Sequence, residues 1–228
     1  DHRDLHSFPT RRSSDLKIAA LARPAFSALA AVAAQTAGDA QRIAGLGAGN
    51  VNVCGNLKFD VAPAPDRIAL GKAWRAALGG RPVWLAASTR EGEEALVLEA
   101  WREIAATRAL LVLVPRHPQR FAEVAALLAG RGIDFVRRSD GLPGSQTQVW
   151  LGDSMGEMAA YYALADIAFI GGSLLPLGGQ NLIEAAACGC PAVVGPHTFN
   201  FLQATADAIA AGAAVRAPDA PGLAATIG

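Results

Sequence analysis

PVWLAASTREGEEALVLEAWREIAATRALLVLVPRHP, residues 82–118, is the stretch of this sequence that decides the fold. Its two apolar runs, at 82–87 and 109–114, have the length and composition of buried strands. Between them, residues 91–107 carry apolar side chains at helical spacing. Short apolar strands that alternate with helices are typical of a parallel sheet with helices on both faces. We therefore expect an α/β fold.

The same alternation continues on both sides of this stretch, and a Pro pair at Pro63 and Pro65 marks the expected linker. Further strands are expected at 51–54, 134–137, 149–152, 167–170 and 192–194. Further helices are expected at 24–37, 39–46, 67–78, 119–130, 155–163, 182–188 and 201–211.

Composition excludes several classes of protein. Hydrophobic residues make up 52% of the 228 residues and charged residues 18%, which favours a packed core over disorder. The net charge of zero argues against nucleic acid as the main partner. The three cysteines suit a reducing compartment better than a disulfide scaffold. No run reaches the roughly 20 uninterrupted apolar residues of a membrane span, and no signal peptide is visible.

Residues 1–16 differ from the rest of the chain, because they contain neither Ala nor Gly and hold two of the four histidines. They have no helical or strand periodicity. We expect a non-native leader or a flexible terminus here.

Ligands of parallel sheets bind beyond the carboxyl ends of the strands, so the loops that follow the strands are the candidate site. Ser88 and Glu91 have capping-box spacing, which predicts a helix start that either binds an anion or only caps the helix. Arg116 stands between two prolines at the end of a buried strand, where a guanidinium could clamp a phosphate. A role for the neighbouring His117 stays open.

The third loop repeats the capping-box spacing at Ser154 and Glu157. Gly156 would then lie in the first turn of a helix, where glycine costs roughly 1 kcal/mol relative to Ala. Either a flat group such as a base approaches the backbone there, or Gly156 merely packs against a neighbour.

The last loop is rich in glycine, with pairs at 171–172 and 178–179, and is followed by Asn181 and Glu184. Glycine N–H groups and the next helix start could meet a phosphate. The Glu184 carboxylate could accept hydrogen bonds from two ribose hydroxyls. An ordinary glycine-rich connection with a solvated Glu is the alternative. Another glycine cluster, at 45–49, follows an expected helix instead of a strand, which disfavours a dinucleotide oxidoreductase.

Taken together, these loops resemble the C-terminal half of the bacterial 3-deoxy-D-manno-octulosonic acid (Kdo) transferases. The motifs that carry the resemblance are GNLKFD at 55–60, ASTREGEE at 87–94, VPRHP at 114–118, GDSMGE at 152–157, GGS through GGQN to Glu184 at 171–184, and GPHTFNF at 195–201. The family is similar to two-domain GT-B glycosyltransferases. The resemblance implies a Rossmann-like GT-B domain with a parallel sheet, plus a remnant of the N-terminal domain.

The resemblance also implies a function. Such enzymes transfer Kdo from CMP-Kdo to the lipid A precursor lipid IVA in lipopolysaccharide biosynthesis, at the cytoplasmic face of the bacterial inner membrane. They invert the anomeric centre and need no metal or other cofactor. The implied CMP contacts are Pro115, Arg116, Met155, Gly156, Glu157, Asn181, Leu182, Ile183 and Glu184. Further donor-facing candidates are Lys58, Ser88, Gly178 and Gly179.

The expected organisation is a leader at 1–16, a remnant of the N-terminal acceptor domain with linker at 17–62, and a donor-binding domain at 63–228. No catalytic residue is expected here, because the family's general-base Glu lies in the N-terminal domain. The chain is thus expected to bind CMP-Kdo without transferring the sugar. Two alternatives remain open: a GT-B enzyme that uses a UDP-sugar, such as a GlcNAc transferase or UDP-GlcNAc 2-epimerase, and a non-catalytic nucleotide-binding module.

Overall fold

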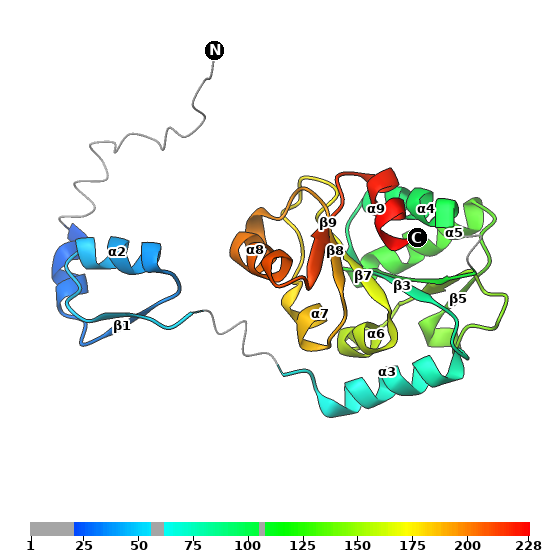
Figure 1. Ribbon diagram of the computed structural model, residues 1–228, viewed down its shortest axis with the longest axis horizontal. Coiled ribbons are helices and arrows are strands. Elements are labelled where there is room, and N and C mark those ends of the chain that lie inside the picture. The colour runs from blue at the N-terminus through cyan, green and yellow to red at the C-terminus, as the bar shows by residue number, and fades with distance from the viewer. Residues whose placement is uncertain (1–20, 56–61, 105–107) are drawn as a thin grey trace, which may run out of the picture. The chain divides into compact units, whose positions relative to one another are not determined.

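The computed structural model describes residues 21–55, 62–104 and 108–228, which belong to two compact units (Figure 1). The units are Asp1–Asp60 and Val61–Gly228. The site lies in the larger unit.

The smaller unit contains a helix that includes residues 21–27, followed by β1 (Val32–Ala34), α2 (Ala37–Gly45) and β2 (Val51–Val53). β1 and β2 pair in parallel. The prediction of a helix at 24–37 is therefore wrong in its second half, because residues 32–34 form β1. An Ala-rich segment has the propensity for a helix, but the backbone hydrogen bonds to β2 override it.

The larger unit is a parallel seven-stranded sheet in the order β5-β6-β4-β3-β7-β8-β9. This confirms the α/β prediction. Its elements are α3 (Pro65–Ala77), β3 (Val83–Thr89), α4 (Glu93–Ile104), β4 (Leu110–Pro115), η3 (Pro118–Arg120), α5 (Phe121–Gly130), β5 (Phe135–Arg137), η4 (Arg138–Asp140), β6 (Val149–Leu151), α6 (Met158–Leu164), β7 (Ile167–Ile170), α7 (Ile183–Ala187), β8 (Ala192–Val194), η5 (Phe199–Phe201), α8 (Leu202–Ala210), β9 (Ala214–Arg216) and α9 (Ala220–Ile227).

The sequence analysis missed β9 and α9. β9 is a three-residue edge strand of which two residues are exposed, so it carries no apolar run. Its place is set by pairing with β8, in which Ala192 lies opposite Ala214.

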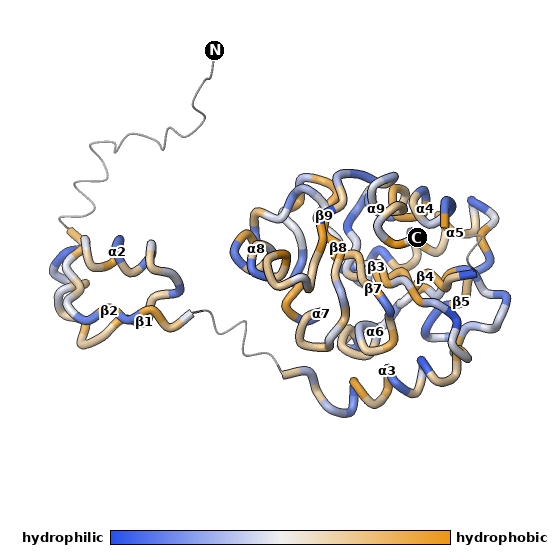
Figure 2. Tube along the Cα trace, in the orientation of Figure 1, coloured by the Kyte–Doolittle hydropathy of each residue, from blue (hydrophilic) through white to orange (hydrophobic). Residues whose placement is uncertain are grey.

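Two hydrophobic layers cover the two faces of the sheet. One includes side chains from α3, α6 and α7, and the other includes side chains from α4, α5 and α9. β3 contributes alternately to both, with Leu85 in the first layer and Trp84 in the second. In Figure 2 the central strands are accordingly mostly orange. Burial on both faces explains why β3 and β4 are nearly continuous apolar runs.

The strand order reverses at β3, the central strand of the sheet. From this strand the chain proceeds to β4 on one side and later to β7 on the other. In the register of these parallel pairs, Ala87 lies opposite both Val114 and Ile170. The loops that follow β3, β4 and β7 therefore leave from one edge of the sheet, at the kind of switch point where α/β proteins bind ligands.

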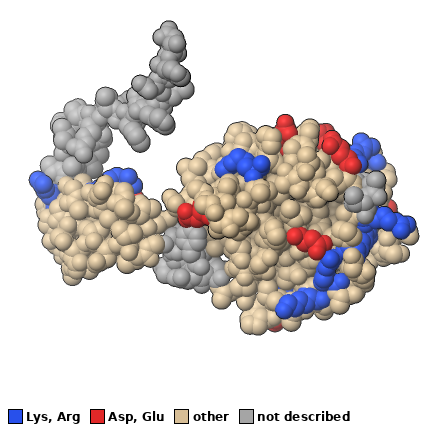
Figure 3. Space-filling view, in the orientation of Figure 1, with Lys and Arg blue, Asp and Glu red and all other residues tan. Residues whose placement is uncertain are grey.

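The surface of the larger unit carries its charges unevenly. Figure 3 shows Lys and Arg gathered along the side on which α3 lies, while most of the visible face is uncharged. Among the described residues, no helix combines the length and the apolar character that crossing a membrane requires.

A close contact joins α3 to α6 beneath the sheet. A Cβ atom on Gly71 would stand 2.3 Å from the carbonyl oxygen of Ala160. One turn further along α3, the ring of Trp74 packs edge-on against Trp150, with centroids 5.0 Å apart, and lies 5.3 Å from Tyr161. The missing side chain at Gly71 is thus what lets the two helices bring these rings together.

We expect Gly71→Ala to lower the free energy of unfolding by about 1–3 kcal/mol, because the added methyl group forces α3 away from α6. Urea denaturation of the chain measures this. Gly130→Ala is the matched control, since Gly130 is also helical but has open space at its Cβ position. Equal stability of Gly71→Ala and the unsubstituted chain would contradict the close-contact argument.

Candidate functional site

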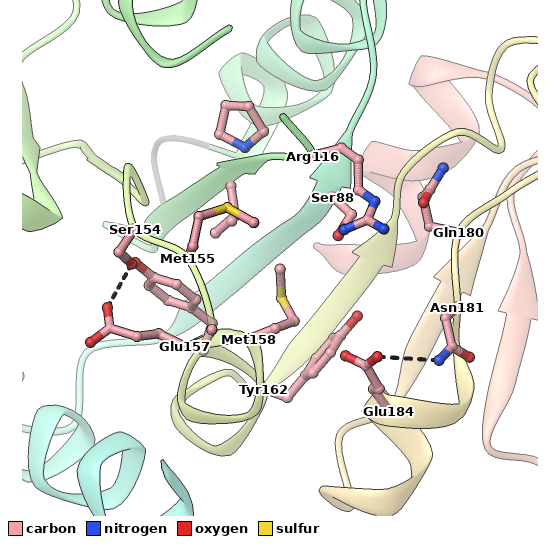
Figure 4. Close-up of a pocket in the computed structure, with 14 residues that line it drawn as sticks. Ser88, Arg116, Ser154, Met155, Glu157, Met158, Tyr162, Gln180, Asn181 and Glu184 are labelled. Atoms are coloured by element: carbon pink, nitrogen blue, oxygen red, sulfur yellow. Dashed lines mark hydrogen bonds between the residues drawn. The ribbon is translucent and has the colours of Figure 1, made fainter. Parts of the chain in front are cut away.

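An open pocket lies at the carboxyl edge of the sheet (Figure 4). It is built by the ends of β3 and β4, the loop that precedes α6, the start of α6 itself, and the loop that leads into α7. Its lining residues are Ser88, Val114, Pro115, Arg116, Ser154, Met155, Gly156, Glu157, Met158, Tyr161, Tyr162, Gln180, Asn181 and Glu184.

Arg116 supplies the pocket with a positive charge. Its backbone N–H donates to the carbonyl of Thr89 at 2.9 Å, which fixes the turn after β4 against the end of β3. Its side chain is exposed and makes no hydrogen bond or ion pair with any residue that the structure describes. The guanidinium is thus held at the pocket by the backbone while its donors stay free for an anion.

Glu157 lies on the opposite wall of the pocket, and its carboxylate is paired with cationic side chains of the protein itself. It accepts a hydrogen bond from the Ser154 hydroxyl at 2.6 Å and pairs with Arg138 at 3.1 Å and Arg67 at 3.9 Å. The Tyr161 hydroxyl lies 2.8 Å from Ser154 Oγ. These contacts give Glu157 a role in holding the loop.

The capping box expected at Ser154 and Glu157 is wrong, because α6 begins only at Met158 and Glu157 makes no cap hydrogen bond with its side chain. Gly156 consequently precedes the helix. It has φ +74, and a Cβ atom there would meet open space. Glycine is required by the positive φ of this turn and imposes no cost on the helix.

Glu184 forms the third side of the pocket with Asn181. The Asn181 side chain accepts from the Ile183 N–H at 3.1 Å and donates to Glu184 Oε1 at 3.2 Å. This arrangement leaves the second Glu184 oxygen without a hydrogen bond to a described residue. Leu182 and Ile183 belong to the hydrophobic core and do not line the pocket.

The expectation that the glycine pairs offer N–H groups to a phosphate is wrong for Gly171, Gly172 and Gly179. The Gly171 N–H donates to Ala87, that of Gly172 to Glu93, and that of Gly179 to Gly172. Gly178 and Gly179 lie outside the pocket lining, and Gly178 packs closely against Asn200. The backbone donors of Gly171, Gly172 and Gly179 are therefore already used within the protein, in tight turns and close packing.

Glu93 is one of the residues that sequence reasoning missed. Its side chain is fully buried and accepts from the backbone N–H groups of Arg90 at 2.9 Å, Gly172 at 2.5 Å and Leu174 at 3.0 Å. It therefore ties the loop after β3 to the loop after β7. From the sequence, an acidic residue at a helix start indicates only a favourable interaction with the helix dipole.

The helix start expected at Ser88 is also wrong, because α4 begins at Glu93 and Ser88 belongs to β3. Ser88 has φ +55, a strained conformation for a residue other than glycine. A Cβ atom on Gly171 would lie 2.4 Å from the Ser88 carbonyl oxygen. This irregular strand end turns Ser88 into the pocket.

Two tyrosines in the pocket, Tyr161 and Tyr162, were not singled out from the sequence, because they lie inside an expected helix. Lys58 lies outside the described residues. Across residues 21–55, 62–104 and 108–228, no three His, Cys, Asp or Glu side chains are grouped so as to hold a metal ion.

Comparisons with known proteins point to one family. A family model described as 3-deoxy-D-manno-octulosonic-acid transferase (kdotransferase) matches residues 8–61. The 3-deoxy-D-manno-octulosonic acid transferase of Bordetella pertussis is 54% identical over 205 residues, which cover 87% of this chain and 48% of the relative. That of Haemophilus influenzae is 42% identical over 194 residues, which cover 81% and 45%. The chain thus spans about half the length of these curated relatives.

Among solved structures, the chain is similar to the C-terminal CMP-Kdo binding domain of WaaA from Acinetobacter baumannii. The two share 36% identity with a TM-score of 0.68, and the match covers 72% of this chain and 88% of that one. This similarity, at 36% identity, confirms the GT-B-type domain fold expected from the sequence.

We expect Glu93→Gln to lower the free energy of unfolding by about 2 kcal/mol, because the amide loses one of the two oxygens that accept buried N–H groups. Chemical denaturation of the chain measures the change. Glu99→Gln, on the exposed side of the same helix, is the matched control and should have little effect. Unchanged stability of Glu93→Gln would show that the two loops do not depend on this carboxylate.

Proposed function

Because the chain belongs to the 3-deoxy-D-manno-octulosonic acid transferase family, we propose that its pocket binds the nucleotide part of the donor sugar CMP-Kdo. The observation that carries this proposal is the convergence of one unpaired guanidinium and one partly free carboxylate on a single pocket, at Arg116 and Glu184. The similarity to a solved CMP-Kdo binding domain supports the same ligand.

The walls of the pocket suit the parts of a cytidine monophosphate. Gly156 has no side chain, and its neighbour Met155 is exposed, so a flat base can approach between this loop and Pro115. The free oxygen of Glu184 suits a ribose hydroxyl, since an ionised carboxylate only accepts hydrogen bonds. Asn181 holds that carboxylate in place, and the buried residues Leu182 and Ile183 support the turn from behind.

Side chains are left to bind the phosphate, because the N–H groups of Gly171, Gly172 and Gly179 in the neighbouring loop are engaged within the protein. Arg116 supplies the charge and Ser88 a hydroxyl donor at the same edge of the pocket. In a transfer reaction CMP is the leaving group, and a fixed guanidinium beside its phosphate stabilises the negative charge that develops there. We add Lys58 to this set as a further cation.

For the whole protein we propose transfer of Kdo to lipid IVA in lipopolysaccharide biosynthesis, with inversion and without a metal ion, at the cytoplasmic face of the inner membrane. In this proposal residues 63–228 bind the donor, and residues 17–62 belong to the acceptor domain. The general base and the acceptor site are assigned to the N-terminal half of the family's fold. The chain itself then binds the donor without transferring it.

Isothermal calorimetry with CMP and UMP tests the donor. We expect CMP to bind more tightly than UMP, and Glu184→Gln to weaken CMP binding by about tenfold, the equivalent of one charge-assisted hydrogen bond. Glu99→Gln, far from the pocket, is the matched control and should bind CMP normally. A preference for UMP would favour the UDP-sugar alternative, and unchanged affinity of Glu184→Gln would remove this residue from ribose binding.

A transfer assay with labelled CMP-Kdo and lipid IVA tests the division of labour. We expect no labelled lipid from the chain, and product once a full-length relative such as the Bordetella pertussis enzyme replaces it. Turnover by the chain would show that residues 1–228 contain the catalytic group.

A further inference from the structure

Tyr162 is a buried side chain whose hydroxyl has no hydrogen-bond partner among the described residues. The residue is 3% exposed. It nevertheless lines the pocket. In Figure 4 its hydroxyl points toward the same part of the pocket as the Glu184 carboxylate.

The neighbouring Tyr161, by contrast, has a hydroxyl that is hydrogen-bonded within the protein. Its hydroxyl lies 2.8 Å from Ser154 Oγ, and Ser154 in turn donates to Glu157. A phenol hydroxyl that has no protein partner and reaches a pocket hydrogen-bonds to what fills the pocket, water or ligand. The unpaired hydroxyl of Tyr162 faces a pocket, so its partner is to be sought in the ligand.

The two groups have complementary roles. Burial, and after it the negative charge of Glu184, raises the pKa of Tyr162 above its usual range, so the phenol stays protonated and can donate. Glu184 is a pure acceptor when ionised. Its Oε1 is already engaged by Asn181, whereas the other oxygen is free.

We propose that Tyr162 is a specificity-determining residue, which donates a hydrogen bond to the ribose hydroxyl whose proton Glu184 accepts. This inference rests on the proposed nucleotide binding. It adds that the pocket selects nucleotides by one ribose hydroxyl. A hydroxyl donates once and accepts twice, so one ribose hydroxyl satisfies both side chains. A nucleotide without that hydroxyl leaves the phenol and the carboxylate without a partner from the ligand, and sites built to hydrogen-bond a hydroxyl discriminate against such analogues.

Calorimetry of the 228-residue chain with CMP, 2′-deoxy-CMP and 3′-deoxy-CMP tests the proposal, with Tyr162→Phe as the variant. The substitution removes one oxygen and keeps the buried ring. We expect Tyr162→Phe to weaken CMP binding by about tenfold and to leave the affinity for one of the two deoxynucleotides within about twofold. The deoxynucleotide whose affinity is unchanged is the one that lacks the hydroxyl to which Tyr162 donates.

Tyr161→Phe is the matched control, because it removes a phenol oxygen that is bonded within the protein. Any loss of affinity in this variant should be equal for all three nucleotides. Thermal unfolding of both variants establishes that they are folded.

The outcomes distinguish a failure of the proposed nucleotide binding from a failure of the role of Tyr162. No binding of CMP by the unsubstituted chain would overturn the proposed function together with this inference. Binding of CMP with unchanged affinity in Tyr162→Phe, or an equal loss for all three nucleotides, would overturn the role of Tyr162 alone and leave the donor pocket standing.

Discussion

A single buried carboxylate holds the binding edge of this sheet together. Strand pairing aligns β3 with β7 only as far as the ladder runs, and the loops beyond it need another constraint. Glu93 supplies it by accepting N–H groups from both loops, at Arg90 on one side and at Gly172 and Leu174 on the other. Three backbone donors replace the hydration of the buried charge, which explains how it persists with no exposed surface.

Glycine completes this edge by allowing the backbones to approach. The Ser88 carbonyl occupies the space where a side chain of Gly171 would lie, and the Ser173 carbonyl stands 2.1 Å from the Cβ position of Gly195. The Ser173 hydroxyl also accepts from the Gly195 N–H at 2.8 Å. The loops after β7 and β8 are thereby held against each other, and the N–H groups of Gly172, Gly179 and Gly195 are hydrogen-bonded within the protein. In the proposed donor pocket, binding of the phosphate is therefore assigned to side chains, with Arg116 first among them.

The charged groups of the pocket divide into those that build it and those that remain available. Glu157 is compensated by Arg138 and Arg67, so its charge stabilises the wall. Glu184 has only the neutral amide of Asn181 as a partner, and Arg116 has no partner among the described residues. Charged groups that meet at a pocket without a charged partner are the pattern expected where a ligand completes the set.

The sequence by itself determined the parallel α/β sheet and the loops that form the pocket. Runs of buried apolar residues report burial on both faces of a strand, and parallel strands bring their carboxyl ends to one edge, so Arg116, Gly156 and Glu184 could be grouped in advance. Only the tertiary structure decided that residues 32–34 form a strand, that neither Ser88 nor Ser154 caps a helix, and that the Tyr162 hydroxyl has no partner among the described residues. Glu93 shows the physical reason. The acceptor and its donor at Gly172 are 79 residues apart, and nothing local in either segment records that the fold brings them within a hydrogen bond.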